Sequence, residues 1–349
     1  MDRIKIIDIA DIHSDYDSLS KVADYARNTE HDIVLVRGDI IEGVFSERVA
    51  EIFVNLNNGY RERKIGFLQI MHHNGADKSL LERIAEDEIG YLELCNIRDD
   101  PQMDLKVRNF AKQFAEFKSE YDEANKKLIE SAKESMIKQY EKVKEIMEGL
   151  EYLTLPGNHD GKCLEDVMGE RNLHGKVKEV KGFKFGGFGG STVYPGAIPK
   201  ELLVLYDEGI ARDSEGDLVK FSELYSKMPE ESEIIIAHEM PQTYLHPENS
   251  FGLTDFMVNN EKSLALVGHM HKEAGVHSLN GESIIINPGS LGEQDIFAEI
   301  SICRKDGKPT PEFISFKRIN EDKVETFVEG KLDDYKKPSK GLFSYRILE

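Results

Sequence analysis

Short apolar runs recur along the chain, and a polar loop follows each of them. Ile4–Ala10 is a nearly continuous β-branched run, and Ile33–Val36 is a second one. Similar runs lie at 152–155, 234–237 and 264–267. Runs of this length are typical of strands buried in a sheet that helices cover. Because residues 18–28 carry a helix pattern between the first two runs, the sequence predicts an α/β fold with polar loops at the carboxyl ends of its strands.

A long helix pattern occupies the middle of the chain. Residues 103–148 contain neither Gly nor Pro, with Asp100 and Pro101 before them and Gly149 after them, as at the two ends of a helix. Apolar residues recur every three or four positions, at Phe110, Phe114, Phe117, Tyr121, Ala124, Leu128, Ala132, Met136, Tyr140, Val143, Met147 and Leu150. A continuous helix of this kind is on the order of 70 Å long, which is more than one crossover between strands needs.

We therefore interpret residues 44–136 as an inserted helical module. Residues 46–56 and 78–94 are its expected partner helices, and only the last turns of the long helix form the crossover into the strand at 152–155. Three roles for the module stay open: a packing elaboration, a dimerisation arm, or a lid over the site. His72 and His73 lie in the module and are interpreted as exposed polar residues.

The second half of the chain is rich in short strands, which suggest a second sheet packed on the first. The expected strands lie at 176–180, 184–186, 284–286, 297–302 and 313–316. The predicted fold is a four-layer α/β/β/α sandwich of two mixed sheets with an inserted long-helix module. Its core takes residues 1–43 and 137–330, the insertion 44–136, and a polar C-terminal tail 331–349. The glycine-rich run 186–191 follows a strand but opens no helix, so it is interpreted as a tight loop and not as a dinucleotide-binding motif.

Composition narrows the class of protein. The chain has 349 residues, of which 40% are hydrophobic and 32% charged, and its net charge is -20. This charge weighs against a broad basic surface, so long nucleic acid is not an expected partner. No apolar run approaches the roughly 20 residues of a membrane span, and the first strand begins too early for a signal peptide. Three scattered cysteines without metal-ligand spacing complete the expectation of a cytoplasmic protein with no membrane contact.

Five polar fragments stand directly after the predicted strands. They are Asp11-Ile12-His13, Gly38-Asp39, Gly157-Asn158-His159-Asp160, His238 and Gly268-His269-Met270-His271. Besides His159, they offer carboxylate and amide oxygens together with four imidazoles. This set can hold two divalent ions, which lie about 3.5–4 Å apart in such sites and stabilise both the attacking and the leaving oxygen of a phosphoryl transfer. Mixed nitrogen and oxygen donors suit manganese, iron, zinc, nickel or cobalt better than magnesium or calcium.

In this order the five fragments resemble the motifs of the calcineurin-like metallophosphoesterase superfamily. Two further pieces, 187–191 with Tyr194-Pro195 and 286–290, are similar to those of small prokaryotic phosphoesterases in that superfamily. The resemblance covers residues 4–41 and 150–302, and it does not extend to the helical module. It implies an enzyme that hydrolyses phosphate esters.

The resemblance also implies a role for each residue. One ion would be held by Asp11, His13, Asp39 and His271. The other would share Asp39 and add Asn158, His238 and His269. A hydroxide between the ions would attack phosphorus, Asn158 would help to hold the phosphate, and His159 would protonate the leaving oxygen.

Two positions depart from the phosphoprotein phosphatase branch of that superfamily. Glu42 stands where that branch has an Asp that orients the catalytic His, and its longer side chain is a candidate for the same outer role. Gly43 stands where that branch has an Arg that grips phosphate. A protein phosphatase is therefore not expected.

The predicted function is the hydrolysis of phosphodiester bonds in a small substrate, with a nucleotide as one candidate. A diester is preferred because no cationic side chain follows the metal motifs to bind a dianionic monoester. The alternatives are a phosphomonoesterase or pyrophosphohydrolase with the same centre, a nuclease, and a metal-binding scaffold for protein interactions. Manganese is the first choice of metal, and a homodimer through the helical module is an open option.

Overall fold

The computed structural model describes most of the chain. The described residues are 2–42, 47–73, 78–85, 94, 96–97, 99–100, 105–195, 198–212, 217–242, 249–321, 323–335 and 344–347. The chain divides into two compact units, of which unit 1 is Met1–Gly43 with Ser135–Glu349 and unit 2 is Val44–Glu134. The sequence placed these boundaries at 43/44 and 136/137. All predicted site residues belong to unit 1.

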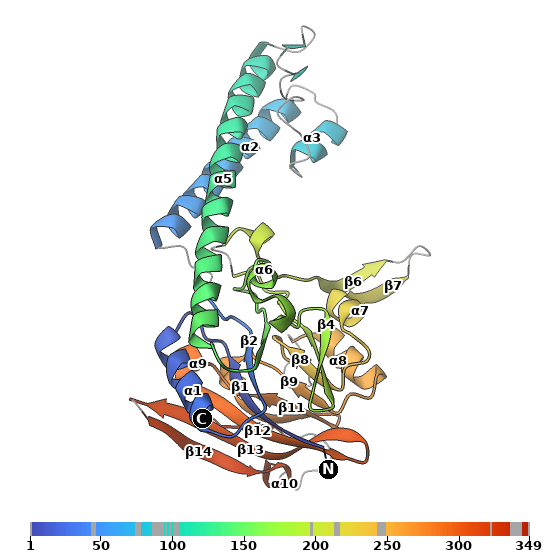
Figure 1. Cartoon of the computed structure of the whole chain (residues 1–349). Helices are drawn as coiled ribbons and strands as arrows, with labels where there is room; N and C mark the ends of the chain where they lie inside the picture. Colours follow the sequence, from blue (N-terminus) through green and yellow to red (C-terminus); the bar gives the residue numbers. More distant parts are fainter. Residues whose placement is uncertain are drawn as a thin grey trace. The chain divides into compact units, whose positions relative to one another are not determined.

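Unit 1 contains a six-stranded mixed sheet (Figure 1). Its strands are, in spatial order, β14 (Lys323–Lys331), β13 (Lys308–Asn320), β12 (Ile296–Lys305), β1 (Arg3–Ala10), β2 (Ile33–Arg37) and β3 (Tyr152–Leu155). The last three are parallel, and β12 pairs antiparallel with β1. The prediction that residues 297–302 and 313–316 join the second sheet is therefore wrong. They extend the first sheet because β1 has a free edge on the side away from β2.

A seven-stranded sheet forms the other half of the sandwich. Its strands are β15 (Ser344–Arg346), β10 (Gly275–Leu279), β11 (Ser283–Asn287), β9 (Leu264–Leu266), β8 (Ile234–Ala237), β5 (Phe183–Phe188) and β4 (Lys176–Val180). The four strands from β11 to β5 are parallel to one another. Because β15 pairs with β10, the predicted C-terminal tail contributes a strand to this sheet, whereas residues 336–343 and 348–349 of that tail lie outside the described residues.

The two sheets share one buried core. Ile6, Leu35 and Leu153 from the first sheet join Phe185 and Ile236 from the second in a single apolar cluster. Every second side chain of a strand points to the same face of its sheet. Apolar side chains from the facing sides of the two sheets can therefore pack together. The helices that cover the outer faces complete an α/β/β/α sandwich, which is the predicted fold class.

Helices flank both sheets. Those of unit 1 are α1 (Tyr16–Asn28), the last turns of α5 (Leu105–Ile146), α6 (Leu164–Met168), α7 (Glu223–Lys227), α8 (Phe251–Asn259), α9 (Leu291–Gln294) and α10 (Leu332–Tyr335). Three 3-10 turns lie at Gly169–Arg171, Lys200–Leu202 and His271–Glu273. Leu224 of α7 and Phe256 of α8 pack on the outer face of the second sheet. On the first sheet, α1 meets the end of α5, where Arg27 donates to the Ile146 carbonyl at 2.6 Å.

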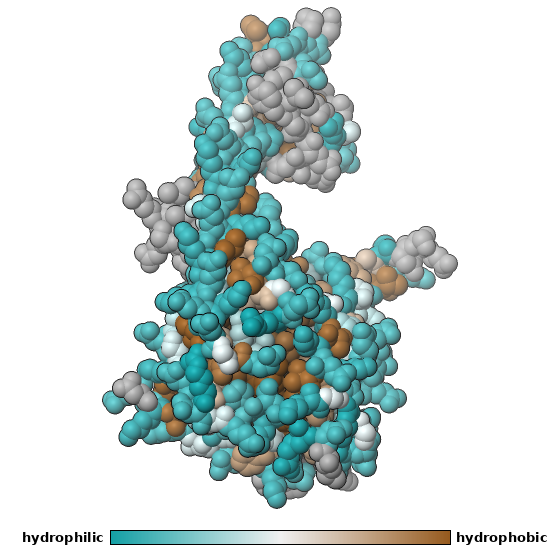
Figure 2. Space-filling view, viewed as in Figure 1, coloured by the Kyte–Doolittle hydropathy of each residue, from teal (hydrophilic) through white to brown (hydrophobic). Residues whose placement is uncertain are grey.

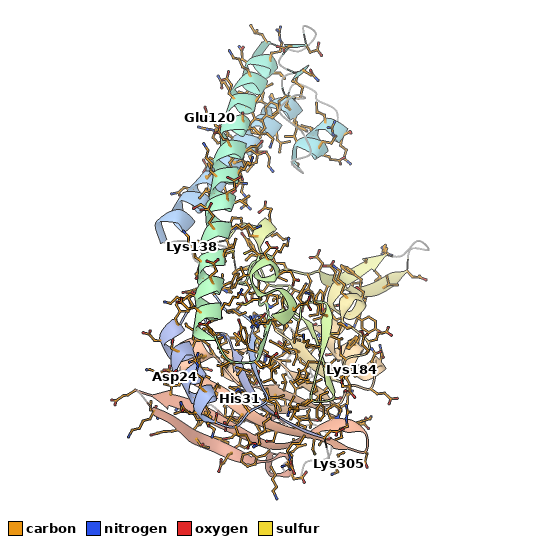
Figure 3. All side chains as sticks on the ribbon, in the orientation of Figure 1. Asp24, His31, Glu120, Lys138, Lys184 and Lys305 are labelled. Carbon is orange, nitrogen blue, oxygen red and sulfur yellow. The ribbon has the colours of Figure 1, made fainter. Side chains whose placement is uncertain are left out.

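Unit 1 has a largely hydrophilic surface in the face that Figure 2 shows. The labelled Asp24, Lys184 and Lys305 lie on its outside (Figure 3). A hairpin of β6 (Glu208–Arg212) and β7 (Leu218–Ser222) carries the exposed apolar side chains of Ile210 and Leu218. In the part of the chain that the structure describes, no helix combines the length and the apolar character that crossing a membrane requires.

Unit 2 is helical and has a core of its own. It contains α2 (Glu47–His73), α3 (Lys78–Ala85) and the first part of α5. Phe67 of α2 stacks on Phe114 of α5 with ring centroids 4.8 Å apart. The sequence predicted a helix over 46–56, whereas α2 continues through Gly59 to His73. Burial of the apolar residues that follow outweighs the cost of a glycine within a helix, which is about 1 kcal/mol.

Candidate metal centre

The predicted site residues stand on loops at the carboxyl ends of parallel strands. Asp11 follows β1, Asp39 follows β2 and Asn158 follows β3 in the first sheet. His238 follows β8 and His269 follows β9 in the second. The ends of the two sheets meet here, since Asp11 Oδ1 and His238 Nδ1 are 3.6 Å apart.

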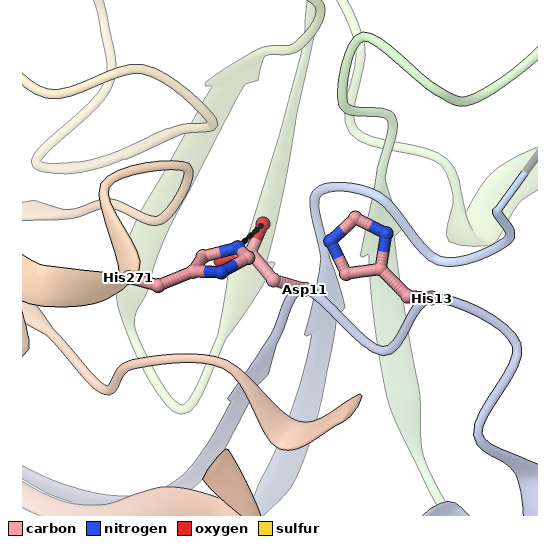
Figure 4. A group of neighbouring side chains, drawn as sticks. All are labelled: Asp11, His13 and His271. Carbon is pink, nitrogen blue, oxygen red and sulfur yellow. Dashed lines mark ion pairs between the residues drawn. The ribbon is translucent and has the colours of Figure 1, made fainter. Parts of the chain in front are cut away.

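Asp11, His13 and His271 form a first group of candidate ligands (Figure 4). One donor atom from each lies within 4.8 Å of the others, and the Oδ1 of Asp11 is 4.0 Å from the Nε2 of His271. Asp11 is fully buried, whereas each of the two histidine side chains is 17% exposed. The group therefore opens toward solvent on the side of its imidazoles.

Asp39, His238 and His269 form a second group, with donor atoms that also lie within 4.8 Å of one another. The Nε2 of His238 is 3.4 Å from the Oδ2 of Asp39 and 3.1 Å from the Nδ1 of His269. Asn158 joins this group, because its Oδ1 is 3.0 Å from the same Nε2.

The two groups adjoin each other. Asp39 reaches the first group, since its Oδ2 is 4.0 Å from the Nε2 of His13. Asp11 reaches the second group, since its Oδ1 is 3.6 Å from the Nδ1 of His238. The structure thus brings all seven predicted ligands into one cluster, with Asp39 between the two groups.

The donor set fits divalent metal ions. Asp11 Oδ1, His13 Nε2 and His238 Nδ1 are buried and have no hydrogen-bond partner among the described residues. Buried polar atoms are rarely left unpaired in folded proteins, so such atoms in one cluster call for a partner of another kind. Carboxylate and imidazole donors with free lone pairs suit a transition-metal ion.

At two positions of the motifs the backbone comes so close to a candidate ligand that only glycine fits. A Cβ on Gly157 would overlap the backbone nitrogen and the Oδ1 of Asp39. A Cβ on Gly38, whose φ is +64°, would overlap the imidazole of His238. The glycines in Gly38-Asp39 and Gly157-Asn158 therefore leave room for ligand side chains of neighbouring loops.

The loops carry backbone strain. Positive φ angles occur at Asp11 (53°), His13 (48°), Ser14 (62°), Asp39 (39°) and His269 (65°). Such conformations cost on the order of 1–3 kcal/mol each for residues other than glycine, and they gather at functional sites. Hydrogen bonds to the carbonyl of Asp11 from the Ser290 hydroxyl (2.8 Å) and the Gly292 amide (3.1 Å) help to hold the first loop.

Buried charge shapes the ionisation of the cluster. Burial raises the pKa of Asp11 to about 6, and the negative charge of Asp39 adds to this. For Asp39 burial acts in the same direction, but the charge and the contact of His238 outweigh it and hold the pKa below its usual range. For His238 burial lowers the pKa, yet the carboxylates of Asp39 and Asp11 raise it to about 9. Burial, with the charge of His238, lowers the pKa of His269 to about 3. The two buried carboxylates thus need positive charge beside them.

Some supporting residues were not identified from the sequence. Glu293 Oε2 lies 2.7 Å from the Nδ1 of His271, which directs the Nε2 of that ring toward Asp11. Its position in α9, just after the 286–290 motif, was the available signal. Arg37 and Asp8 form a fully buried ion pair on adjacent strands, with 2.6 and 2.7 Å contacts. The signal there was an arginine at the end of an otherwise apolar run.

Asp160 is a further missed residue, although it stands within the third motif. It is fully buried and accepts hydrogen bonds from the amides of Gly157 (2.7 Å), Ile40 (3.0 Å) and Ile41 (3.3 Å). Burial raises its pKa to about 6, and the charge of Asp39 adds to this. Asp160 ties the loop after β3 to the loop after β2.

His159 stands beside the cluster and outside both candidate groups. Its amide donates to Asp39 Oδ1 at 2.8 Å, and its ring packs edge-on to that of His13 with centroids 5.3 Å apart. Glu42 contacts His159 through its backbone carbonyl, 3.3 Å from Nδ1. The contact found between Glu42 and His159 thus involves the backbone and not the predicted carboxylate. The carbonyl can accept a proton held on Nδ1, and Nε2 is then the ring nitrogen with a free lone pair.

Comparisons with known proteins give distant structural likenesses. No protein-family model matches the sequence, and no curated protein matches it significantly. The structure is similar to that of TT1561 from Thermus thermophilus, at 14% identity and a TM-score of 0.42, over 93% of this chain and 98% of that one. It is also similar to a predicted phosphoesterase from Streptococcus pneumoniae, at 11% identity and a TM-score of 0.33, over 94% and 98%. The calcineurin-like phosphoesterase YfkN from Bacillus subtilis matches at 12% identity and a TM-score of 0.33, over 93% and 90%.

At identities of 14% or less and TM-scores below 0.5, these likenesses are distant.

Proposed function

We propose that this chain is a metal-dependent phosphoesterase that holds two divalent ions and hydrolyses phosphodiester bonds in a small substrate. The observation that carries the proposal is the adjoining pair of donor groups. Asp39 of the second group lies 4.0 Å from His13 of the first, and buried oxygen and nitrogen atoms of the cluster are unpaired among the described residues. With Asp39 counted toward both groups, the cluster would offer four side chains to each of two ions.

The ligands divide as the two groups do. Asp11, His13 and His271 would hold one ion, Asn158, His238 and His269 the other, and Asp39 both. When bound, such ions make a water nucleophilic near neutral pH and neutralise the charge that develops on phosphate. The chain itself supplies the fixed positions of these donors on the strand ends.

His159 is the proposed proton donor to the leaving oxygen. Its ring is only half buried, it belongs to neither donor group, and its amide is anchored to Asp39. A proton donor must be held within reach of the departing atom and must not itself be consumed as a ligand. Its place beside Asp39 and His13, outside both donor groups, supports this role.

Manganese is the proposed metal. The first group combines two imidazoles with a carboxylate, and the second adds the amide oxygen of Asn158. Such mixed donors suit manganese, and iron, zinc, nickel and cobalt are accommodated by the same ligands. A second copy of the chain as partner through unit 2 stays a prediction.

A diester is the preferred substrate because of the charges near the cluster. The guanidinium of Arg37 is fully buried and bound to Asp8, so it is withheld from substrate. A monoester carries one more negative charge than a diester and needs an additional cationic contact. The position at which an arginine would provide one in a phosphoprotein phosphatase is Gly43, which lies outside the described residues.

The test compares hydrolysis of bis-p-nitrophenyl phosphate with that of p-nitrophenyl phosphate in the presence of Mn²⁺, with and without a chelator. We expect diester turnover that the chelator abolishes and added Mn²⁺ restores. Preference for the monoester would indicate a phosphomonoesterase with the same centre. Asp39→Asn is the control variant, since it should lower metal content and activity together. Unchanged activity in Asp39→Asn, or turnover that resists the chelator, would refute the proposal.

A further inference from the structure

The last turns of α5 pack directly against the loops of the candidate centre. Met136, Tyr140, Val143 and Met147 are buried, at spacings of four and three residues that place them on one face of the helix. The sulfur of Met136 lies 2.7 Å from the point where a Cβ on Gly161 would stand. The helix therefore approaches the loop after β3 as closely as a glycine allows.

Tyr140 makes two hydrogen bonds with this loop. Its hydroxyl donates to Asp160 Oδ1 at 3.0 Å and accepts from the amide of Gly161 at 2.7 Å. Tyr140 and Asp160 are both fully buried. The same carboxylate accepts the amides of Gly157, Ile40 and Ile41, so the phenol completes a network that joins α5 to the loops after β2 and β3.

Gln139 makes a second connection, to the loop after β1. Its Oε1 accepts from the hydroxyl of Ser14 at 2.8 Å, and that hydroxyl accepts from the amide of Glu42 at 3.0 Å. Glu42 in turn contacts His159 through its carbonyl. Adjacent residues of α5 thus hold both ends of the segment 40–42.

We propose that Tyr140 is a positioning residue for the metal centre, with Gln139 in a supporting role. The proposal rests on the proposed function, because it concerns the geometry of the same donors. Through Asp160, Tyr140 fixes Asp39 and Asn158, which stand one residue from Ile40 and Gly157. Among the described residues, the hydrogen bonds of Tyr140 and Gln139 involve no donor atom of the two candidate groups.

The hydroxyl of Tyr140, and not its ring, carries the proposed role. In Tyr140→Phe the ring still fills its place on α5, but Gly161 loses its acceptor and Asp160 loses one donor. Both groups are buried, so water cannot replace the lost contacts without moving the loops. Residues that orient metal ligands typically alter metal affinity about 10–100-fold when they are replaced. We expect Tyr140→Phe to weaken Mn²⁺ binding by tenfold or more, with a smaller effect in Gln139→Met.

The experiment is a calorimetric titration of the full-length protein with Mn²⁺, at a temperature where every variant is folded by circular dichroism. Tyr25→Phe is the matched control. The hydroxyl of Tyr25 donates to Glu299 at 2.8 Å, and neither residue belongs to the site. Tyr152→Phe controls for loss of a buried phenol, since Tyr152 is 1% exposed and its hydroxyl donates to the sulfur of Met168 at 3.7 Å. Both controls should bind Mn²⁺ as the unmodified chain does.

The outcomes separate the two proposals. The expected result is weakened Mn²⁺ binding in Tyr140→Phe, and to a smaller extent in Gln139→Met, but not in the two controls. In Tyr140→Phe, kcat should also be lowered at saturating Mn²⁺ while KM is unchanged. An Mn²⁺ affinity of Tyr140→Phe equal to that of the unmodified chain would overturn the positioning role. So would a loss of Mn²⁺ affinity in the two controls as large as that in Tyr140→Phe. Absence of Mn²⁺ binding in the unmodified chain would instead overturn the proposed function. If Tyr140→Phe does not fold, Gln139→Met decides, because Gln139 is only half buried and its loss should still lower the affinity measurably.

Discussion

Replacing Gly157 with alanine tests how the loops of the candidate centre fit together. The added Cβ would overlap the backbone nitrogen and the Oδ1 of Asp39 and would lie 2.9 Å from its Cγ. These atoms belong to the backbone or to a short, buried side chain, so they cannot move aside freely. The carboxylate that stands between the two donor groups would be displaced.

The expected magnitude follows from the buried position of the contact. Forcing a methyl group into a packed interior costs about 1–3 kcal/mol of folding stability. The same displacement stretches the hydrogen bond from the Gly157 amide to Asp160, which is 2.7 Å long. Because Asp39 serves both groups, metal affinity should fall by the roughly 10–100-fold typical of a disturbed ligand environment.

Urea unfolding in the presence of a chelator measures the first quantity, and calorimetric titration with Mn²⁺ measures the second. Gly59→Ala is the control, because Gly59 lies within α2 and nothing stands within 4 Å of its added Cβ. There the substitution should stabilise the helix by about 0.5–1 kcal/mol. Stability and Mn²⁺ affinity that are both unchanged in Gly157→Ala would refute the close approach between the two loops.

Three further predictions concern single side chains. His159→Ala should abolish turnover of diesters with poor leaving groups while Mn²⁺ binding persists. Calorimetry measures the binding and a steady-state assay the turnover, and lost binding or retained turnover would contradict the role of His159. Arg37→Met should lower the free energy of unfolding by about 3–5 kcal/mol, because it leaves Asp8 as an unpaired buried charge. Adding Asp8→Leu should recover most of this loss, and urea unfolding of the single and double variants measures both effects. The hydrogen bond from Arg304, outweighing burial, lowers the pKa of Glu233, so this pair should contribute up to about 1 kcal/mol above pH 4.5 and lose it as the pH falls through the lowered pKa; in Glu233→Gln that pH dependence of stability should be absent.

The strand ends and their polar residues could be predicted because both depend on local pattern. Ile4–Ala10 and Ile33–Val36 are apolar enough to be buried strands, and the residue types that follow have few uses in common other than metal binding. Since parallel strands end at the same edge of a sheet, Asp11 and Asp39 were expected to meet. The sequence could not show how near they come, which depends on the glycine contacts of neighbouring loops.

The supporting residues could not be predicted because they act across long sequence separations. Tyr140 reads as one more apolar position of a helix, and only the fold places its hydroxyl against Asp160. The prediction of which sheet β12 and β13 join was wrong for a related reason. Their alternation predicts strands, but the free edge of β1 that they extend is a property of the assembled sheet.

The attachment of unit 2 bears on the same loops. The insertion leaves unit 1 two residues after Glu42 and returns five residues before Tyr140, so both points of attachment adjoin residues that hold the site. A flexible insertion at these points would loosen Asp39 and His159 unless the loops were tied independently. Asp160 and Ser14 provide such ties from within unit 1, through buried or partly buried hydrogen bonds. The hydrogen bonds of Tyr140 and Gln139 therefore anchor the ligand loops to the part of α5 that belongs to unit 1.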